Sequence, residues 1–269
     1  MPVFTVKNQN IKLVDFLSEN LFISKNKAKK LVDSREVFVN NQRVWIASYI
    51  LNRGDVVEYR DIFSFERGKI DIIYEDDFII VVNKPPFIVT NEEENSVESF
   101  LRKEKGFESI RAIHRIDKET SGLVLFAKNN EVFEAYRKLW MKKEVKKVYL
   151  AISSGEAKFK EKRIVTPVDG KFALSLVKVV KIKNGFSMFE VEIKTGRKHQ
   201  IRKHLASIGH PVVGDKEYYR GKIENDIVRS VPRQLLHSYK IEFYCPFTGK
   251  PKKFFSPVPE DFNKFFSKI

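Results

Sequence analysis

The chain has 269 residues, and its 50 Lys and Arg against 35 Asp and Glu give a formal net charge of +15 at pH 7. Such an excess of positive charge indicates a polyanionic partner, with nucleic acid as the first candidate; the alternative is a basic protein without such a partner. The hydrophobic fraction of 42%, with 23 Phe, is sufficient for a packed core in one large domain or in a domain plus a small module.

The sequence also excludes several classes of protein. No apolar run approaches the length of a membrane span, and no basic region followed by a long apolar stretch opens the chain, so we expect no membrane partner, no signal peptide and a cytoplasmic location. The single cysteine, Cys245, can form neither a disulfide within the chain nor a cysteine-based zinc site. The five histidines lack a metal-ligand spacing and there is no Gly-rich phosphate loop, so we expect no metal and no cofactor.

The first 60 residues have the pattern of a small, separate module. Apolar residues spaced as the buried side of a helix occupy residues 11–21. A second and strongly basic helix is predicted over residues 25–32, with Ser24 as its N-cap. Residues 37–44 then predict a hairpin with Asn40 and Asn41 at its turn, and a turn and a short strand follow at residues 52–59.

These elements resemble the S4 RNA-binding module. Its pattern is an apolar residue, a Ser, basic residues, a Val-x-Val-Asn strand and a late Gly-Asp, and here it is carried by Ile23, Ser24, Lys25, Lys29, Val37, Val39, Asn40, Gly54 and Asp55. The resemblance implies phosphate contacts, which position a protein on RNA without recognising sequence, from Lys25, Lys29, Lys30 and Arg43. Lysines alone are more typical of a solvated helix face, but the match of the whole module favours an RNA-binding domain at residues 1–60, followed by a linker at residues 61–69.

The larger part of the chain begins with two predicted strands around an acidic turn, at residues 71–85, ended by Pro85 and Pro86. A Glu-rich loop at residues 91–95 and a short helix near residues 97–103 come next. These segments lead into the most informative part of the chain.

A polar turn that carries Asp117 precedes a predicted buried strand at residues 124–128. Residues 114–123 are His-Arg-Ile-Asp-Lys-Glu-Thr-Ser-Gly-Leu, so that Arg115 and Lys118 flank Asp117. Nearby cations favour an ionised carboxylate, and an ionised carboxylate held at a turn can be a nucleophile. Most Asp residues before a strand are turn formers or helix caps, so the residue types alone favour a structural role.

Further elements follow in order. Aromatic and apolar residues at helical spacing over residues 132–140 predict a helix packed on the core, and part of the cationic cluster at its end is interpreted as an RNA contact. Strands are predicted at residues 147–153, 174–183 and 188–193. A helix then opens within residues 195–205, with Arg202 off its apolar side.

Several of these segments, in a fixed order, resemble motifs of the RluA family of pseudouridine synthases. Residues 114–123 resemble the family's catalytic motif, and residues 74–85 resemble its first motif, a Tyr-Glu-Asp turn, a strand and Asn-Lys-Pro. The Lys-Val-Tyr-Leu-Ala segment at residues 147–151 resembles the second motif, and Gly-Arg-Lys-His-Gln-Ile-Arg-Lys-His at residues 196–204 resembles another. The family usually has Gly two residues after the motif's proline, where this chain has Phe87, so the conformation of that loop is left open.

The resemblance, which runs from about residue 70 to residue 257, implies a fold and an activity. The fold is α+β: a small S4-like α/β module, then a catalytic domain at residues 70–269 with a long mixed, largely antiparallel sheet, flanking helices and a central cleft. The activity is isomerisation of specific uridines to pseudouridine in structured RNA, without a cofactor. Large-subunit (23S) ribosomal RNA is the expected substrate, because several relatives with an S4 module act there.

The resemblance also implies roles for individual residues. Asp117 is the nucleophile, with attack on sugar or base left open. Arg202 pairs with Asp117, and Tyr149 packs on the target base as a candidate group for removing the C5 proton. The base must be flipped out of its helix, and Arg115 fills the place that it leaves. The RNA-binding residues of this domain are then Arg115, Lys147 and Arg197.

Other functions stay open at this point. Transfer RNA is an alternative substrate. A non-catalytic RNA-binding or ribosome-assembly factor with the same fold is an alternative function, against which Asp117, Tyr149 and Arg202 argue together. A base-excising hydrolase also needs a flipped base and a carboxylate, but it would release free uracil. We expect a monomer.

Overall fold

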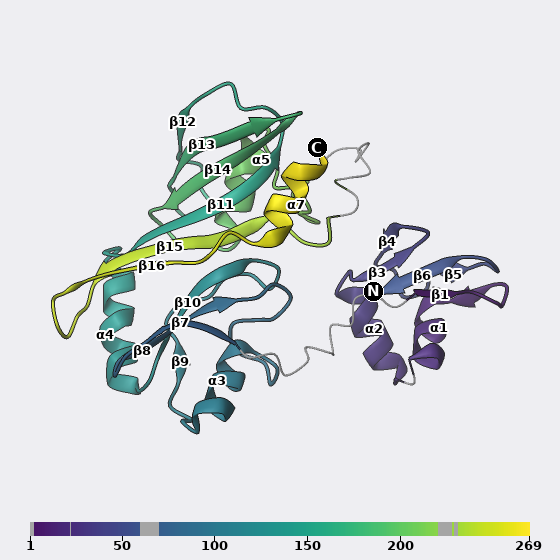
Figure 1. Ribbon diagram of the computed structural model, residues 1–269, viewed down its shortest axis with the longest axis horizontal. Coiled ribbons are helices and arrows are strands. Elements are labelled where there is room, and N and C mark those ends of the chain that lie inside the picture. Colours follow the sequence, from purple (N-terminus) through teal and green to yellow (C-terminus); the bar gives the residue numbers. More distant parts are fainter. Residues whose placement is uncertain (1–2, 22, 60–69, 220–227, 229–230) are drawn as a thin grey trace. The chain divides into compact units, whose positions relative to one another are not determined.

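The computed structural model describes residues 3–21, 23–59, 70–219, 228 and 231–269. The chain forms two compact units, Met1–Lys69 and Ile70–Ile269 (Figure 1). The linker predicted at residues 61–69 lies outside the described residues. Within the described ranges, no helix combines the length and the apolar character needed to cross a membrane.

The first unit contains a four-stranded antiparallel sheet and a separate two-stranded one. The strands of the larger sheet, in spatial order, are β1 (Val3–Thr5), β6 (Val56–Tyr59), β3 (Val37–Val39) and β4 (Gln42–Val44). The smaller sheet pairs β2 (Ile11–Lys12) with β5 (Ile50–Leu51). The helix predicted at residues 11–21 therefore starts too early: its first two residues extend the chain to pair with β5, a partner that helical spacing cannot indicate.

The described part of this unit also contains two helices, α1 (Leu13–Asn20) and α2 (Lys25–Asp33). Their apolar sides pack on the sheet in one core of buried residues, formed among others by Leu13, Leu17, Ala28, Leu31, Val32, Val37, Val39 and Val57. The predicted N-cap is confirmed, because the Ser24 hydroxyl accepts a hydrogen bond from the Lys27 amide, at 3.3 Å. The predicted hairpin is also confirmed, and Asn40 and Asn41 have the positive φ values, 49° and 63°, that its tight turn requires.

A mixed sheet of ten strands, within the described ranges, forms the second unit. Eight of them follow one another in the order β12 (Glu161–Ile164), β13 (Ser175–Lys183), β14 (Phe186–Ile193), β11 (Lys146–Ser154), β15 (Leu236–Tyr244), β10 (Ser121–Ala127), β8 (Ile79–Lys84) and β7 (Asp71–Glu75). In addition, β16 (Pro251–Phe255) pairs with β15 and β9 (Arg111–Ala112) pairs with β10. Among these pairings β10–β15 is parallel and the others are antiparallel, which confirms the predicted mixed, largely antiparallel sheet.

Helices flank this sheet, as Figure 1 shows for α3 (Val97–Lys105), α4 (Asn130–Met141), α5 (Gln200–Ser207) and α7 (Glu260–Lys268). From α4, Val132 and Tyr136 are buried in a cluster with apolar residues of β8 and β10. From α7, three Phe side chains are buried in a second cluster that includes Leu150 and Ile152 of β11. Successive side chains of a strand point to opposite faces, so Tyr149, next to Leu150, points to the face away from α7.

The parallel pairing of β10 with β15 depends on one glycine. Gly122 lies opposite Ser238 and has φ 108°, and a Cβ built on it would be 2.3 Å from the carbonyl oxygen of Ser238. Any side chain here would push the two strands apart. The Thr-Ser-Gly step of the predicted catalytic motif is therefore the point at which that loop enters the middle of the sheet.

Candidate active site

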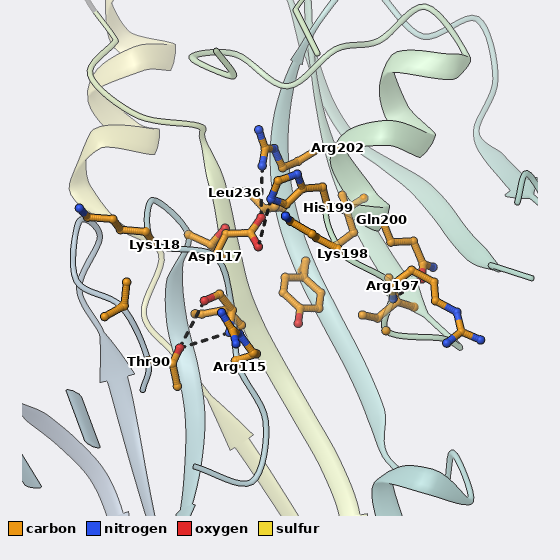
Figure 2. Close-up of a pocket in the computed structure, with 17 residues that line it drawn as sticks. Thr90, Arg115, Asp117, Lys118, Arg197, Lys198, His199, Gln200, Arg202 and Leu236 are labelled. Carbon is orange, nitrogen blue, oxygen red and sulfur yellow. Dashed lines mark hydrogen bonds and ion pairs between the residues drawn. The ribbon is translucent and has the colours of Figure 1, made fainter. Parts of the chain in front are cut away.

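A cavity of about 660 Å³ is lined by two segments that are far apart in the sequence (Figure 2). One is the loop before β10, with residues 115–118 and Thr120; the other leads into α5, with residues 196–202. Tyr149, Ile193 and Leu236 of the sheet also line it. The volume is in the range of small-molecule sites, so the cavity can hold one nucleotide rather than a helix.

The backbone of the loop that carries Asp117 is held by hydrogen bonds from buried polar side chains. The Thr90 hydroxyl makes hydrogen bonds with both the amide and the carbonyl of Ile116, each at 3.3 Å. The fully buried Lys84 ammonium donates to the carbonyls of Lys118, Ile88 and Pro85, at 3.1, 2.8 and 2.9 Å. Burial, and then the charge of Arg233, hold the pKa of Lys84 well below its usual value. These contacts fix the backbone on both sides of Asp117.

Phe87, the departure from the family pattern, adopts the conformation that favours glycine. Its φ is 73°, in the left-handed region, and its amide donates to the carbonyl of Lys118 at 2.7 Å. The loop after the Asn-Lys-Pro segment is therefore attached directly to the catalytic loop. A bulky side chain is strained at such a φ, which accounts for the usual Gly at this position.

The groups that approach the Asp117 carboxylate come from α5 and the residue before it, not from its neighbours in sequence. Arg202 forms an ion pair with it, and the ring of His199 lies nearby. Asp117 Oδ2 lies 3.5 Å from Arg202 Nη1, and Oδ1 lies 3.8 Å from His199 Nε2 (Figure 2). The flanking Arg115 instead pairs with Glu92, at 2.8 Å. The expected proximity of Asp117 and Arg202 is thus present, but the flanking cations that first suggested an ionised carboxylate are not its ion-pair partners in the described structure.

Arg202 makes its shortest contacts with a different carboxylate, Asp215. Its Nε and Nη2 donate to the two oxygens of Asp215, at 2.6 and 2.9 Å, and Nη2 also lies 3.3 Å from Glu217 Oε2. Burial disfavours the charge of Arg202, but the hydrogen bonds with Asp215 more than offset it, and the pKa of Arg202 is raised. The third nitrogen, Nη1, is left to reach Asp117.

Asp215 is a site residue that the sequence analysis missed. Its side chain is fully buried, and it accepts two more hydrogen bonds from the amides of Glu217 and Tyr218, at 2.8 and 3.0 Å. Burial raises the pKa of its carboxyl, but its hydrogen bonds and the charge of Arg202 together lower this pKa by a larger amount, so the net shift is downward. The segment Gly209–Asp215 also resembles the family, but that resemblance assigned Asp215 no role. The pairing forms only because the chain between Arg202 and Asp215 folds back.

His199 is a second residue that was missed. It precedes α5 with φ 56°, in the left-handed region, and this conformation directs its ring into the cavity wall (Figure 2). Its Nδ1 lies 3.0 Å from the Tyr218 hydroxyl and 3.3 Å from Glu217 Oε2. Burial lowers the pKa of His199, although Asp117 acts in the opposite direction. Strained backbone of this kind is frequent at functional sites.

Tyr149 lies in the cavity wall as an apolar surface with a neutral hydroxyl. It is buried, and burial together with the charge of Asp117 raises its pKa to about 12. The phenol therefore stays protonated at neutral pH. Its ring can pack on a base, and it becomes a proton acceptor only if the bound substrate changes its surroundings.

The remaining predicted RNA-binding residues of this unit differ in exposure. Arg115 and Arg197 are exposed and line the cavity. Lys147 is buried, does not line the cavity and has a pKa lowered by burial. A Cβ built on Gly196, in the cavity wall, would lie 4.0 Å from its Nζ. Lys147 thus supplies charge behind the wall rather than a phosphate contact on its surface.

In the first unit, α2 presents Lys25, Lys29 and Lys30 to solvent. Lys25 pairs with Asp15, at 2.8 Å. Arg43 is different: it is half-buried on β4, and its guanidinium lies 5.1 Å from the centre of the Phe38 ring. Exposed lysines on one helix are suited to phosphates, whereas Arg43 is partly engaged in packing.

Comparison with known proteins identifies both units. Residues 78–207 match the family described as RNA pseudouridylate synthase, and residues 11–57 match the S4 domain. An uncharacterised RNA pseudouridine synthase of Helicobacter pylori (strain J99) is 35% identical over 246 residues, which cover 86% of this chain and 92% of that protein. Ribosomal large subunit pseudouridine synthase D of Neisseria meningitidis (serogroup A) is 31% identical over 227 residues, which cover 74% of this chain and 61% of that protein.

A solved structure shares the fold. Human RNA pseudouridylate synthase domain containing 1 superimposes with a TM-score of 0.62 at 23% identity, over 72% of this chain and 85% of that one.

Proposed function

This chain belongs to the RNA pseudouridine synthase family, and we propose that it converts specific uridines to pseudouridine in large-subunit ribosomal RNA. It is an RNA pseudouridine synthase of the RluA type with an S4 domain, as predicted, and RNA is its partner. The choice of ribosomal RNA rests on the Neisseria relative, whose name states that substrate, and on the S4 domain. The net charge of +15 suits a large, highly charged RNA.

The observation that carries the mechanism is a carboxylate in a nucleotide-sized cavity, 3.5 Å from a buried guanidinium. Asp117 is proposed as the nucleophile, through attack on either C1′ of the sugar or the uracil ring. The bond between N1 and C1′ breaks, the uracil turns, and C5 bonds to C1′. The C5 proton leaves and N1 gains a proton, so the reaction is an isomerisation that consumes no other reactant.

The residues around Asp117 divide the remaining tasks. Arg202 orients the carboxylate and keeps a fixed positive charge beside it when RNA excludes water from the cavity. Tyr149 packs on the base and is a candidate acceptor of the C5 proton, once its own hydroxyl proton has passed to another group. His199, neutral and 3.8 Å from Asp117, is the nearest second group able to accept a proton.

The substrate nucleotide must leave its helix to reach Asp117, because a base that stays stacked in a helix cannot enter the cavity. The exposed Arg115 at the cavity edge is proposed to occupy the space that the base leaves. Arg197 is proposed to contact a phosphate beside it. The S4 domain, predicted at residues 1–60, is proposed to hold the RNA through Lys25, Lys29 and Lys30, with a smaller part for the half-buried Arg43. A monomer and a cytoplasmic location remain predictions.

The test is to map pseudouridine across all RNA of a strain that lacks the gene, complemented with the wild type or with Asp117→Asn. We expect at least one large-subunit site to disappear on deletion and to return only with the wild type. In vitro, Asp117→Asn should lower the rate by more than about 10³-fold and leave RNA affinity within about threefold. A missing site in transfer RNA would transfer the proposal to that substrate, and activity of Asp117→Asn within tenfold of wild type would falsify the nucleophile. Release of free uracil, detected by chromatography, would indicate a hydrolase.

The role of the S4 domain is tested separately in the full chain. Exchanging Lys25, Lys29 and Lys30 for Gln should weaken RNA binding and lower its salt dependence, by about 0.7–0.9 in the log–log slope for each phosphate that is no longer neutralised. The single-turnover rate at saturating enzyme should not change. An unaltered salt slope would show that these lysines do not touch the RNA.

A further inference from the structure

Beside the cavity lies a short hairpin whose aromatic side chain has no role in the core. Val168 and Lys171 exchange two backbone hydrogen bonds, at 2.9 and 3.0 Å, around Asp169 and Gly170, which have φ values of 51° and 72°. This is the geometry of a two-residue type I′ turn, a rigid connection. Phe172 follows the turn directly and is 54% exposed.

Four hydrogen bonds hold the backbone around Phe172 against the cavity wall. Arg197 Nε donates to the carbonyl of Phe172, at 3.1 Å, and Gln200 Nε2 donates to that of Leu174, at 3.0 Å. The Leu174 amide donates to Thr195 Oγ1, at 3.0 Å, and the ammonium of the α5 residue Lys203 binds Asp169, at 2.6 Å. Since Arg197 and Gln200 both line the cavity, Phe172 is fixed at its edge.

The Phe172 ring is available for contact with a bound molecule. Among the described residues it has no aromatic partner and no cation over its face, unlike Phe159, which stacks on Phe189 and has the Lys162 ammonium 5.4 Å from its centre. Exposed cations lie beside it in the sequence or at the same edge of the cavity, namely Lys171, Arg197 and Lys198. An exposed aromatic ring among cations is the combination that proteins use to bind unpaired nucleotides, by stacking and by phosphate contact.

We propose that Phe172 stacks on the base of the nucleotide next to the target uridine. This inference rests on the proposed function, because flipping a uridine into the cavity removes one stacking partner from each neighbour. A ring held at the cavity edge replaces that partner, while Lys171 and Arg197 neutralise the adjacent phosphates. Every base has a flat apolar face, so this contact supplies affinity without strong sequence preference.

The experiment uses the full chain and a synthetic RNA stem–loop centred on the uridine found by mapping. Phe172→Ala is compared with Phe172→Trp, which keeps a ring, and with Phe107→Ala. Phe107 is a Phe of similar exposure (57%) whose carbonyl bonds the Ile110 amide, whereas the Phe172 carbonyl bonds Arg197 of the cavity lining. We expect Phe172→Ala to weaken binding about five- to tenfold or more. Phe172→Trp and Phe107→Ala should stay within about twofold of wild type. Circular dichroism checks that each variant is folded.

The decisive measurement removes the base instead of the ring. The same stem–loop is made with an abasic site on one side of the target uridine, and then with one on the other side. On one of these two RNAs, wild type and Phe172→Ala should bind equally, because the stacking partner is absent. On the intact RNA they should differ.

Three results would overturn the inference: equal binding of wild type and Phe172→Ala to intact RNA, an undiminished difference on both abasic RNAs, or a loss for Phe172→Trp as large as for Ala. In each case the wild type still forms pseudouridine, so the proposed function stands. If the wild type forms no pseudouridine in the stem–loop, the proposed function fails, and the role of Phe172 fails with it.

Discussion

Two arginines of the catalytic unit bind an aspartate in the same bidentate way, one at the cavity and one at α7. Arg202 donates through Nε and Nη2 to Asp215, at 2.6 and 2.9 Å, and Arg233 does so to Asp261, at 2.6 and 3.0 Å. Both guanidinium groups are buried. They differ in the third nitrogen, Nη1.

In Arg233 this nitrogen donates to three carbonyls, those of Glu119, Gln234 and Leu236, at 3.2, 3.1 and 3.3 Å. In Arg202 it points into the cavity, and its contact with Asp117 is 3.5 Å, longer than an ordinary hydrogen bond. All three nitrogens of Arg233 therefore donate to groups of the fold, and Arg233 stabilises the backbone near the loop that carries Asp117. Arg202 keeps one donor for the carboxylate of Asp117, which is itself partly exposed. The same pair of residue types thus gives a structural element in one place and a site ready for substrate in the other.

Among the residues of these two pairs, the largest effect on the reaction rate is expected at Arg202. Arg202→Met should lower the single-turnover rate by about 10²–10³-fold, because a preorganised cation beside the reacting carboxylate is lost, while RNA affinity stays within about threefold. Arg202→Lys should retain part of the activity, since an ammonium keeps the charge but not the planar geometry.

The control for this change is the double variant Arg202→Met/Asp215→Asn, which leaves no buried carboxylate unpaired. If it folds like the wild type and is still slow, the loss is catalytic. If Arg202→Met only weakens RNA binding and reacts at the normal rate at saturating enzyme, Arg202 is a phosphate contact. The proposed catalytic difference between Arg202 and Arg233 would then be wrong.

The comparison is sharpened by removing each aspartate in turn. Asp261→Asn should destabilise the fold by about 3–5 kcal/mol, because Asp261 is the one carboxylate that pairs with Arg233 in the described ranges. Asp215→Asn should cost less, about 1–3 kcal/mol, because Arg202 keeps Asp117 and Glu217 nearby. The rates should rank the other way, with Asp215→Asn the slower enzyme. Urea unfolding measures the stabilities and single-turnover kinetics the rates. If Asp261→Asn were both the less stable and the slower variant, the contrast between the two pairs would be wrong.

The sequence motifs placed Asp117, Arg202 and Tyr149 at one cavity, because each lies in a segment with its own pattern. They did not indicate that Asp215 is the main partner of Arg202. That pairing arises from the turn after α5, and a lone Asp carries no periodic signal. The exposed Phe172 was likewise invisible, since exposure depends on how residues 168–174 pack against α5.

The missed elements have physical reasons of their own. The strands β1, β2 and β5 are two or three residues long, too short for an alternating pattern to stand out. The helix α7 was not predicted, although the spacing of Phe262, Phe265 and Phe266 is typical of the buried side of a helix. The long strands β11, β13 and β14 were predicted to within a few residues, because eight or nine residues rich in apolar and β-branched side chains are distinctive. Burial alternates along β14, whereas β11 is buried on both faces.

A smaller effect is expected from acid. The pKa of Asp215 lies below its usual value of 3.8, through the hydrogen bonds from Arg202 that outweigh burial. A carboxyl with a lowered pKa stabilises the fold above its usual pKa, and this contribution is lost as pH falls through the folded value. The stability difference between wild type and Asp215→Asn should therefore be constant from about pH 7 to 5 and shrink below about pH 4. Urea unfolding at several pH values tests this, and a difference that grows on acidification would show that Asp215 is not held as the carboxylate.

The smallest effect concerns a third arginine, Arg115, whose partner is a single exposed carboxylate. Arg115 and Glu92 are 64% and 65% exposed, and such pairs contribute about 0–1 kcal/mol to stability. Glu92→Gln should therefore leave the unfolding midpoint unchanged. It frees Arg115 for RNA, so affinity should rise by up to about threefold, with a slightly steeper salt dependence. Glu93→Gln is the matched control, since it removes the same charge one residue away from a side chain with no ion pair in the described structure. If both variants bind RNA equally well, the gain is general electrostatics. If only Glu92→Gln gains, Arg115 is held back by Glu92 in the free enzyme, and even an exposed carboxylate partner limits how readily RNA recruits an arginine.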